Sequence, residues 1–210
     1  DSCDYIVLSP GINLKKSKLK SKLLRNTHKI ITDLDLFYLF NPNIRSIVIT
    51  GTNGKSTTCK ILEHVLKKNR INVKFGGNIG KPVLELSPIK EGSIRLLELS
   101  SYQIELAKNL APNIAAFINF SSDHLQRHGG LGGYFYAKAR LFLENLTDMS
   151  VINIDTAEGL FLYQRLSSAD NKIIAISSKL DVTGYLGAVV LKGYFITEWK
   201  KGRQVYSFDI

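Results

Sequence analysis

Short apolar runs alternate along most of the chain with longer stretches in which apolar residues recur at helical spacing. The apolar runs predict buried strands at residues 46–49, 72–75, 94–99, 114–120, 151–154 and 173–176. The stretches after them predict helices at about 56–69, 82–86, 100–110 and 134–146, with one more between the last two strands. Strands that alternate with helices are typical of an α/β fold, in which a mostly parallel sheet carries helices on both faces. Ligands of such sheets bind outside the carboxyl ends of the strands.

The two ends of the chain depart from this rhythm. The first part reads as a short strand at 5–8, a basic helix and a second short strand at 29–31. Thr32 or Asp33 then caps a short helix. After about residue 182 the pattern predicts antiparallel strands. We therefore expect a mostly parallel α/β sheet with a small antiparallel portion near the C-terminus.

Composition narrows the class of protein. With 210 residues, 44% of them apolar and 22% charged, the chain has the size and balance of a soluble domain, or of a domain with part of another. It has no charged-then-apolar leader and no apolar run of membrane-spanning length, so we expect a cytoplasmic protein without a membrane partner. Cys3 and Cys59 match no metal or redox spacing, which favours two buried thiols.

A net charge of +10 raises the question of nucleic-acid binding. Much of this charge lies in one tract, in which leucines alternate with Lys15, Lys16, Lys18, Lys20, Lys22 and Arg25. The leucines predict an amphipathic helix over about 14–25 whose basic residues face solvent. Because no aromatic residues are interleaved there and no nucleic-acid module is recognisable, we expect no nucleic-acid partner. Anionic phosphate substrates account for part of the basic balance.

The clearest chemistry lies in TGTNGKST, which follows the strand at 46–49 and opens the next helix. A strand, a glycine turn and a helix N-terminus direct backbone N–H groups and the positive end of a helix dipole at one point, which suits a phosphate. Lys55 adds a mobile positive charge, and the Ser56 hydroxyl suits Mg²⁺. The predicted phosphate-binding residues are Gly51, Thr52, Asn53, Gly54, Lys55, Ser56 and Thr57. The general phosphate loop has glycine where this chain has Ile49, so the alternative is a tight glycine turn without a ligand.

Two candidates follow other predicted strands. Glu98 lies near the carboxyl end of the strand at 94–99, where a carboxylate would face the phosphate loop and share a Mg²⁺ with Ser56. The alternative is a glutamate that caps the following helix. Asn78 lies in the glycine loop GGNIG, where its amide suits a substrate carbonyl or phosphate. Glycine loops of this kind also occur without a ligand.

The segment NFSSDHLQRHG closes the strand at 114–120 with two histidines, an aspartate and an arginine. His124 in this segment is a candidate metal ligand or phosphate contact, and the alternative is a structural histidine. Lys138 lies on the next helix beside small residues. A buried lysine can lose its proton, and the neutral amine can then react with CO₂ to give a carbamate that binds metal. The alternative is an ordinary surface lysine.

Five motifs stand in an order and spacing that resemble the Mur ligase family and its folylpolyglutamate synthase relatives. They are TGTNGKST at 50–57, GGNIG at 76–80, ELSSYQIE at 98–105, NFSSDHLQRHG at 119–129 and YAKARLF at 136–142. SPGI at 9–12 resembles the end of the first domain of these ligases. GGNIG together with ELSSYQ is most similar to the members that add D-glutamate. One departure is Gln126, where the family usually has aspartate.

The resemblance implies an ATP-dependent ligase of cytoplasmic peptidoglycan precursor synthesis, with Mg²⁺ as cofactor. ATP would phosphorylate the carboxylate of UDP-N-acetylmuramoyl-L-alanine, and the amine of D-glutamate would attack the acyl phosphate. The residues to which it gives catalytic roles are Lys55, Glu98, His124 and Lys138. The implied metal ligands are Ser56, Glu98, His124 and Lys138, the last as a carbamate. The implied substrate contacts are Ser9, Pro10, Gly11, Asn78, Ser100 and His124.

The resemblance also implies a division of the chain. Residues 1–43 would be the tail of an N-terminal UDP-substrate-binding domain with a linker, and 44–210 an incomplete central ATP-binding domain. The C-terminal ligase domain would be absent, so we expect a monomer that is inactive by itself. The alternatives are another Mur ligase or a folylpolyglutamate synthase-like ligase and, from a different class, a P-loop nucleotide-binding switch.

Overall fold

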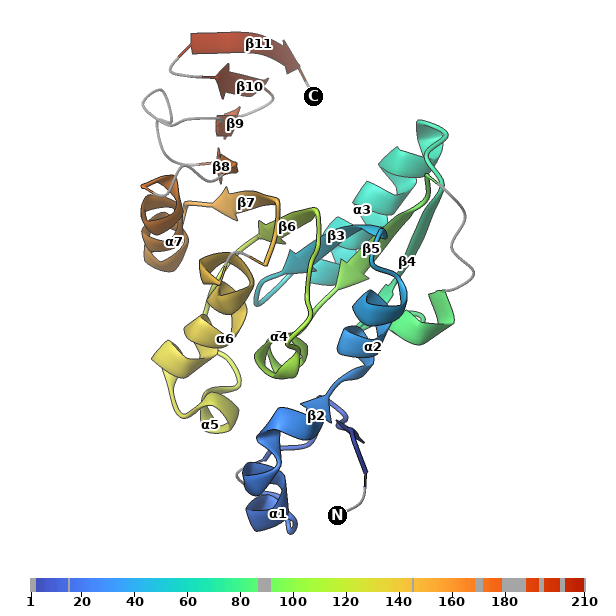
Figure 1. The fold of residues 1–210 in the computed structure, drawn as a ribbon. Coiled ribbons are helices and arrows are strands. Elements are labelled where there is room, and N and C mark those ends of the chain that lie inside the picture. The colour runs from blue at the N-terminus through green and yellow to red at the C-terminus, as the bar shows by residue number, and fades with distance from the viewer. Residues whose placement is uncertain are drawn as a thin grey trace.

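The computed structural model describes residues 3–14, 16–86, 92–144, 146–168 and 172–178, and the backbone of 188–192, 195–200 and 203–209. Nine strands of these residues form one sheet in the order β11-β10-β9-β8-β7-β6-β3-β5-β4 (Figure 1). Its parallel strands are β3 (Arg45–Thr50), β4 (Val73–Gly77), β5 (Ile94–Glu98), β6 (Ile114–Phe117), β7 (Met149–Asn153), β8 (Ile173–Ser177) and β9 (Ala188–Lys192). The antiparallel strands that follow β9 are β10 (Phe195–Lys200) and β11 (Arg203–Asp209). The predicted fold class is confirmed, and the antiparallel portion continues the parallel sheet.

Helices cover both faces of the sheet. The elements on one face are α2 (Asp33–Phe40), the 3₁₀ helix η2 (Val83–Leu86), α4 (Ser101–Leu106), α6 (Leu131–Leu143) and α7 (Ala157–Ser167). They share one apolar core with alternate strand residues such as Val48, Leu97 and Ile152. The other face packs against α3 (Lys55–Lys68), where Cys59 contacts the cluster of Ile49 and Leu96. Neighbouring residues of one strand serve opposite cores because successive strand side chains point to opposite faces.

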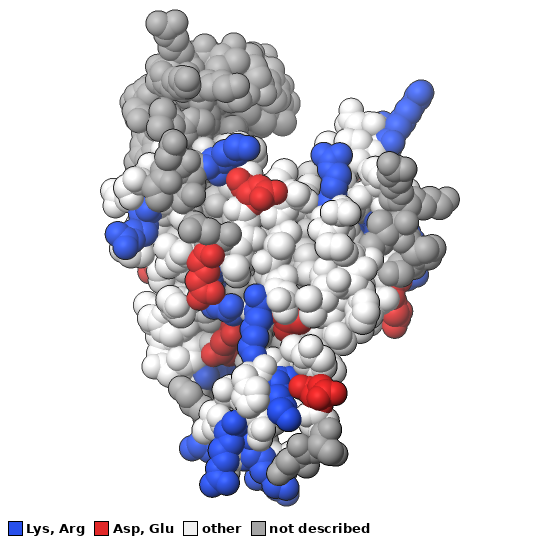
Figure 2. Space-filling model, viewed as in Figure 1, with Lys and Arg blue, Asp and Glu red and all other residues white. Residues whose placement is uncertain are grey.

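Residues 3–31 form a small N-terminal unit beside this sheet, at the opposite end of the molecule from β11 (Figure 1). In it, β1 (Ile6–Val7) pairs in parallel with β2 (Ile30–Ile31). The helix α1 (Lys20–Arg25) packs Leu23 against Leu8 and Ile30, and a 3₁₀ helix η1 (Thr27–Lys29) leads into β2. Lysine and arginine side chains gather at this end of the molecule (Figure 2).

The predicted basic helix over 14–25 forms only in its second half, because α1 begins at Lys20; in this half the basic residues are exposed and Leu23 is buried. The residues before α1 form turns in which short polar side chains bind nearby backbone N–H groups. The Asn13 side chain accepts from the Lys16 N–H at 3.3 Å, and Ser17 accepts from the Leu19 N–H at 3.1 Å. Such local bonds compete with the helical ladder and delay the start of the helix.

The segment between β6 and α6 also differs from the prediction. β6 ends at Phe117, a short helix α5 (Leu125–His128) forms within the predicted loop, and α6 begins at Leu131 rather than near 134. Gly133 inside α6 permits this packing, because a Cβ atom there would lie 2.1 Å from the His128 carbonyl oxygen. Gly133 therefore lets α5 approach α6.

Two other expectations meet the structure differently. Cys59 is buried as expected, whereas Cys3 is exposed, so the expectation of two buried thiols is wrong for Cys3. In the part of the chain that the structure describes, we find no helix with the length and apolar character needed to cross a membrane.

Candidate active site

The phosphate loop of residues 51–54 connects the carboxyl end of β3 to α3. Its backbone needs glycine at both ends. Gly54, the residue before α3, has φ +75°, and Gly51 has φ +155° with no room for a Cβ atom, which would lie 2.6 Å from Ile118 Cγ1. The N–H groups of the first turn of α3, which holds Lys55, Ser56 and Thr57, have no acceptor within the helix. The loop therefore presents backbone donors at the carboxyl edge of the sheet.

Asn119, just beyond β6, holds the phosphate loop in this conformation. Its Oδ1 accepts from the N–H groups of Thr52 (3.0 Å) and Asn53 (2.9 Å), and its Nδ2 donates to the Asn53 carbonyl at 2.8 Å. The Thr52 hydroxyl donates to the Ser121 carbonyl at 3.2 Å and accepts from the Ser121 N–H at 3.1 Å. Because β6 lies next to β3 in the sheet, residues about 66 to 69 positions apart in sequence fix the loop.

Two lysines meet at a single carbonyl of the loop. Lys138 Nζ donates to the Gly51 carbonyl oxygen at 2.7 Å, and Lys55 Nζ donates to the same oxygen at 3.1 Å and to the Thr52 carbonyl at 2.9 Å. Lys138 is 1% exposed, so the interpretation as a surface lysine is wrong. Its Nζ also lies 4.8 Å from the centre of the Tyr134 ring.

The environment of Lys138 favours its neutral form. Burial, and secondly the positive charge of Lys55, lower the pKa of Lys138 from 10.5 to about 7, while Asp123 acts in the opposite direction. An amine with this pKa is substantially unprotonated near neutral pH, which is the form that reacts with CO₂. Lys138 is thus a buried lysine that can lose its proton, which is the condition for carbamate formation.

Glu98 ends β5, the neighbour of β3, and its position opposite Ile49 brings it to the phosphate-loop edge. The residue is 1% exposed, and its charge reaches the Cys59 thiol. Burial, and then Glu98, raise the pKa of that thiol to about 12. Asn78 Nδ2 donates to Glu98 Oε1 at 3.4 Å, and the Asn78 N–H donates to the Glu98 carbonyl at 2.8 Å.

The oxygen atoms at this edge fit a magnesium ion. Among the described residues Glu98 Oε2 is buried without a hydrogen-bond partner, which is costly unless a cation or proton satisfies it. A carboxylate and the hydroxyl of Ser56 in the first turn of α3 are the hard oxygen donors that Mg²⁺ prefers. No group of three or more His, Cys, Asp and Glu side chains suited to a metal occurs in the described part of the chain. Most ligands of such an ion would therefore be phosphate oxygens and water.

His124 lies in the segment 121–129, which follows β6 at the same edge. We call this segment the loop 121–129, although it contains the short helix α5. Its backbone adopts the left-handed conformation, with φ +49°, which is uncommon for a residue other than glycine. The imidazole is 48% exposed and lies 3.4 Å from Asp123 Oδ2. Its ring centre is 6.0 Å from that of Tyr134, so His124 and Lys138 both contact this tyrosine.

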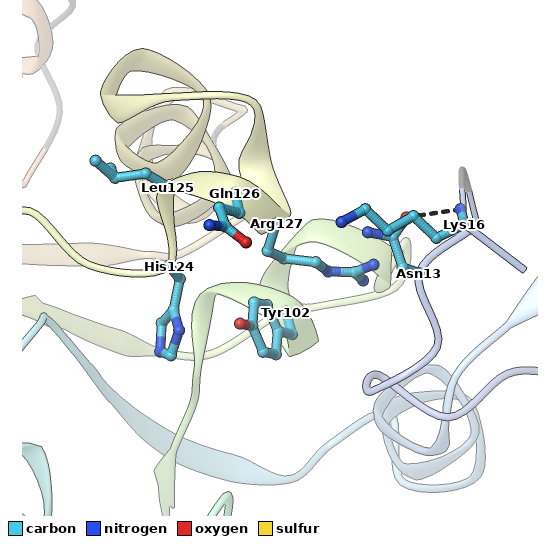
Figure 3. Close-up of a pocket in the computed structure, with 7 residues that line it drawn as sticks. All are labelled: Asn13, Lys16, Tyr102, His124, Leu125, Gln126 and Arg127. Carbon is cyan, nitrogen blue, oxygen red and sulfur yellow. Dashed lines mark hydrogen bonds between the residues drawn. The ribbon is translucent and has the colours of Figure 1, made fainter.

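An open pocket of 490 Å³ lies between the loop 121–129 and the N-terminal unit. Figure 3 shows Asn13 and Lys16 on one side of it and Tyr102 and His124 on the other. Its remaining lining residues are Leu125, Gln126 and Arg127. Gln126 thus lines the pocket with an uncharged amide.

The other predicted substrate contacts lie at different points of this edge. The Ser9–Gly11 turn follows β1 in the N-terminal unit and is tied to the loop 121–129 through Arg127, which donates to the Pro10 carbonyl at 3.4 Å. The Ser100 hydroxyl caps α4, where it accepts from the Gln103 N–H at 3.4 Å. Ser100 therefore has a structural partner in this structure.

Known proteins of similar fold and sequence identify the family of this chain. The solved structure of UDP-N-acetylmuramoyl-L-alanyl-D-glutamate–2,6-diaminopimelate ligase has a similar fold, with a TM-score of 0.63 at 20% identity over 98% of this chain and 55% of that one. The sequence profile of the Mur ligase middle domain matches residues 49–192. The chain belongs to the Mur ligase family. The predicted family resemblance is confirmed.

Two similar curated relatives of this Mur ligase chain carry the same name. A protein of Ruegeria pomeroyi named UDP-N-acetylmuramoylalanine–D-glutamate ligase is 45% identical over an alignment of 224 positions, which covers 100% of this chain and 48% of the relative. A protein of the same name from Cereibacter sphaeroides (strain ATCC 17025) is 46% identical over 173 residues, or 81% of this chain and 37% of the relative. The chain thus spans less than half the length of these relatives.

Sequence reasoning gave no role to three side chains that organise this Mur ligase site: Asn119, Tyr134 and Arg127. Asn119 and Arg127 stand inside the motif that was noted for two histidines, an aspartate and an arginine, of which only His124 was given a role. Tyr134 donates to the Thr52 hydroxyl at 3.3 Å, and burial raises the pKa of its phenol. The available signal was the spacing from Tyr134 to Lys138, since residues four apart lie on one face of a helix.

Proposed function

We propose that this chain is the ATP-binding part of a ligase that joins D-glutamate to UDP-N-acetylmuramoyl-L-alanine in cytoplasmic peptidoglycan precursor synthesis. The observation that carries the proposal is the 45% identity, over the whole chain, to a protein named UDP-N-acetylmuramoylalanine–D-glutamate ligase. The phosphate-loop geometry supports it, because a ligase that activates a carboxylate must bind a nucleotide triphosphate beside the acceptor.

In this proposal the phosphate loop and the first turn of α3 bind the ATP phosphates through their backbone donors. Lys55 would leave the Gly51 and Thr52 carbonyls and neutralise charge on the transferring phosphoryl group. Ser56 and Glu98 would hold Mg²⁺, which offsets charge on the phosphates when bound. The acceptor carboxylate would take the terminal phosphoryl group of ATP, which gives an acyl phosphate and ADP. The amine of D-glutamate would then attack the acyl carbon, which forms the amide and releases phosphate and a proton.

We assign Lys138, as a carbamate, and His124 to a second magnesium ion that orients the acceptor carboxylate. Both side chains contact Tyr134, and the lowered pKa of Lys138 supports carbamate formation. The substrate contacts proposed are Ser9, Pro10, Gly11, Asn78, Ser100 and His124. Asn78 and Ser100 would exchange their present partners, Glu98 and Gln103, for substrate groups.

The division of the chain belongs to the same proposal. Residues 1–43 would be the tail of a domain that binds the UDP end of the substrate, and 44–210 an incomplete central ATP-binding domain. The shares of 37% and 48% of its relatives that the chain covers support this division. The intact enzyme would be a cytoplasmic monomer without nucleic-acid or membrane partners, and the present chain would not turn over by itself.

The test is ADP release by a full-length protein that spans the length of its relatives. We expect turnover that requires both UDP-N-acetylmuramoyl-L-alanine and D-glutamate, and loss of about a thousandfold or more in kcat for Lys55→Ala, because the main phosphate charge partner is gone. The matched control is Lys60→Ala, an exposed lysine on α3. Turnover with a different acceptor pair would point to a sister ligase, and turnover that only RNA or DNA stimulates would contradict the proposal.

A further inference from the structure

The side chain of Arg127 connects two segments that lie more than a hundred residues apart. From α5, its Nη2 donates to the Ile12 carbonyl at 3.2 Å and to the Pro10 carbonyl at 3.4 Å. Both acceptors belong to the turn after β1, in the N-terminal unit. Only 13% of the side chain is exposed, and Figure 3 shows it extending from α5 toward Asn13 and Lys16.

The guanidinium is also held from the side of the large sheet. It lies over the ring of Tyr102, 5.1 Å from the ring centre, and its Nη2 is 3.6 Å from Glu105 Oε2. Tyr102 and Glu105 stand three residues apart on α4 and so present a ring and a carboxylate on neighbouring positions of one helix face. His128 contacts the same two side chains of α4, with Nδ1 3.5 Å from Glu105 Oε1 and its ring centre 5.4 Å from that of Tyr102.

Two further contacts join the N-terminal unit to the large domain at other points. Leu106 packs against the apolar cluster of Leu8, Leu23 and Ile30, and Lys108 Nζ donates to the Thr27 carbonyl at 2.6 Å. These contacts remain when Arg127 is replaced, so the unit can stay folded and attached. The contribution of Arg127 to the turn after β1 can therefore be separated from the attachment of the unit as a whole.

We propose that Arg127 is a positioning residue that holds the turn of residues 9–12 next to the pocket, directly before Asn13, which lines the pocket on the side opposite His124. Its planar, permanently charged guanidinium lies over the Tyr102 ring while one nitrogen, Nη2, donates to both carbonyls, an arrangement that the compact ammonium of a lysine reproduces only in part. The inference rests on the proposed function, in which this turn contacts the UDP-linked substrate. A direct contact between Arg127 and an anionic group of the substrate is the rival explanation.

Hydrogen exchange on the present chain tests the clamp without any substrate. In Arg127→Met we expect the peptide covering residues 9–14 to exchange about tenfold faster, because two hydrogen bonds and a ring contact that hold the turn are lost. Arg127→Lys should give an intermediate rate. Lys108→Met, which removes the side-chain bond to the Thr27 carbonyl of the unit, should leave this peptide unchanged. Unchanged protection of α6 in every variant shows that the fold is intact.

Steady-state kinetics on the full-length enzyme test the positioning role. We expect Arg127→Met to raise KM for the UDP-linked substrate about tenfold while KM for ATP and kcat change less than about twofold. Unchanged exchange of residues 9–14 in Arg127→Met overturns the clamp, and with a raised KM it favours the rival explanation. Faster exchange with an unchanged KM overturns the positioning role. A wild-type enzyme without D-glutamate-dependent ADP release refutes the proposed function but leaves the exchange result standing.

Discussion

The phosphate loop and the loop 121–129 lie at the same edge of the sheet but are held in different ways. The phosphate loop is fixed by Asn119, by the Thr52 hydroxyl and by buried Lys138, all through hydrogen bonds to its backbone or its own side chains. In the loop 121–129, residues 121–126 are exposed. The His124 imidazole lies beside the Asp123 carboxylate and contacts the rings of Tyr102 and Tyr134. The site thus has a preorganised phosphate-binding half and a more exposed half that carries His124.

This difference has a physical basis. A phosphate loop must present several N–H groups at once. The entropy lost when a ligand binds is smaller if other residues have already fixed the backbone that carries these groups. A histidine that binds a metal or a substrate must be accessible, which is consistent with exposure. Uncommon backbone conformations, such as the left-handed one of His124, are found most often at functional sites. The predictions below test whether the two halves differ as the structure indicates.

The largest effect is expected for Asn119→Ala. The change removes three hydrogen bonds to the backbone of the phosphate loop, so we expect a loss of about 1–3 kcal/mol in the free energy of unfolding and an ATP affinity lower by about tenfold or more. Urea unfolding and titration with a fluorescent ATP analogue measure the two quantities.

Asn113→Ala is the matched control for Asn119→Ala. Asn113 Oδ1 accepts from the Ser46 N–H at 2.9 Å, at the amino ends of β3 and β6, away from the phosphate loop. Its replacement should lower stability without changing ATP affinity. Equal losses of affinity in both variants would mean that Asn119 acts only through the stability of the sheet.

The next effect concerns the pH dependence of stability. The pKa of Lys138 is about 7 in the folded chain, whereas an ordinary lysine, as in the unfolded chain, has a pKa of 10.5. Below pH 7 the lysine is protonated in both states and its burial is costly. As the pH rises from about 7 to 10.5, only the folded state releases the proton, so this contribution to stability increases over that range.

Lys138→Met should abolish that rise. We therefore expect the difference in unfolding free energy between wild type and Lys138→Met to change between pH 6 and pH 10, measured by urea unfolding. Lys60→Met, on the exposed surface of α3, should follow the wild-type curve. Parallel curves for wild type and Lys138→Met would show that Lys138 is charged in the folded chain or solvated when it titrates.

The smallest effect on stability is expected for His124→Asn. Asparagine tolerates the left-handed backbone, and the imidazole is 48% exposed, so the unfolding free energy should change by less than about 0.5 kcal/mol. Turnover of the full-length enzyme should nevertheless fall about tenfold or more, because the ring nitrogens are lost. His64→Asn, an exposed histidine on α3, should change neither quantity. A stability loss comparable to that of Asn119→Ala would remove the contrast between the two halves.

The alternation of strands and helices and the phosphate loop were accessible from sequence because both depend on local signals. Apolar runs of strand length and a glycine turn before a helix are read within about fifteen residues. Boundaries were less accessible. The early start of α6 depends on the packing of Gly133 against His128, and the late start of α1 depends on side-chain bonds in the turns before it.

The sequence by itself determined the α/β class, the phosphate loop with Lys55 and the motifs that place the chain in its family, because each is a short pattern with its own physical meaning. The tertiary structure alone decided that Lys138 is buried against the Gly51 carbonyl, that Asn119 fixes the loop and that Arg127 reaches the turn after β1. These contacts join residues between 66 and 117 positions apart. They exist because the sheet places β6 beside β3 and brings the N-terminal unit to α5, which no local pattern encodes.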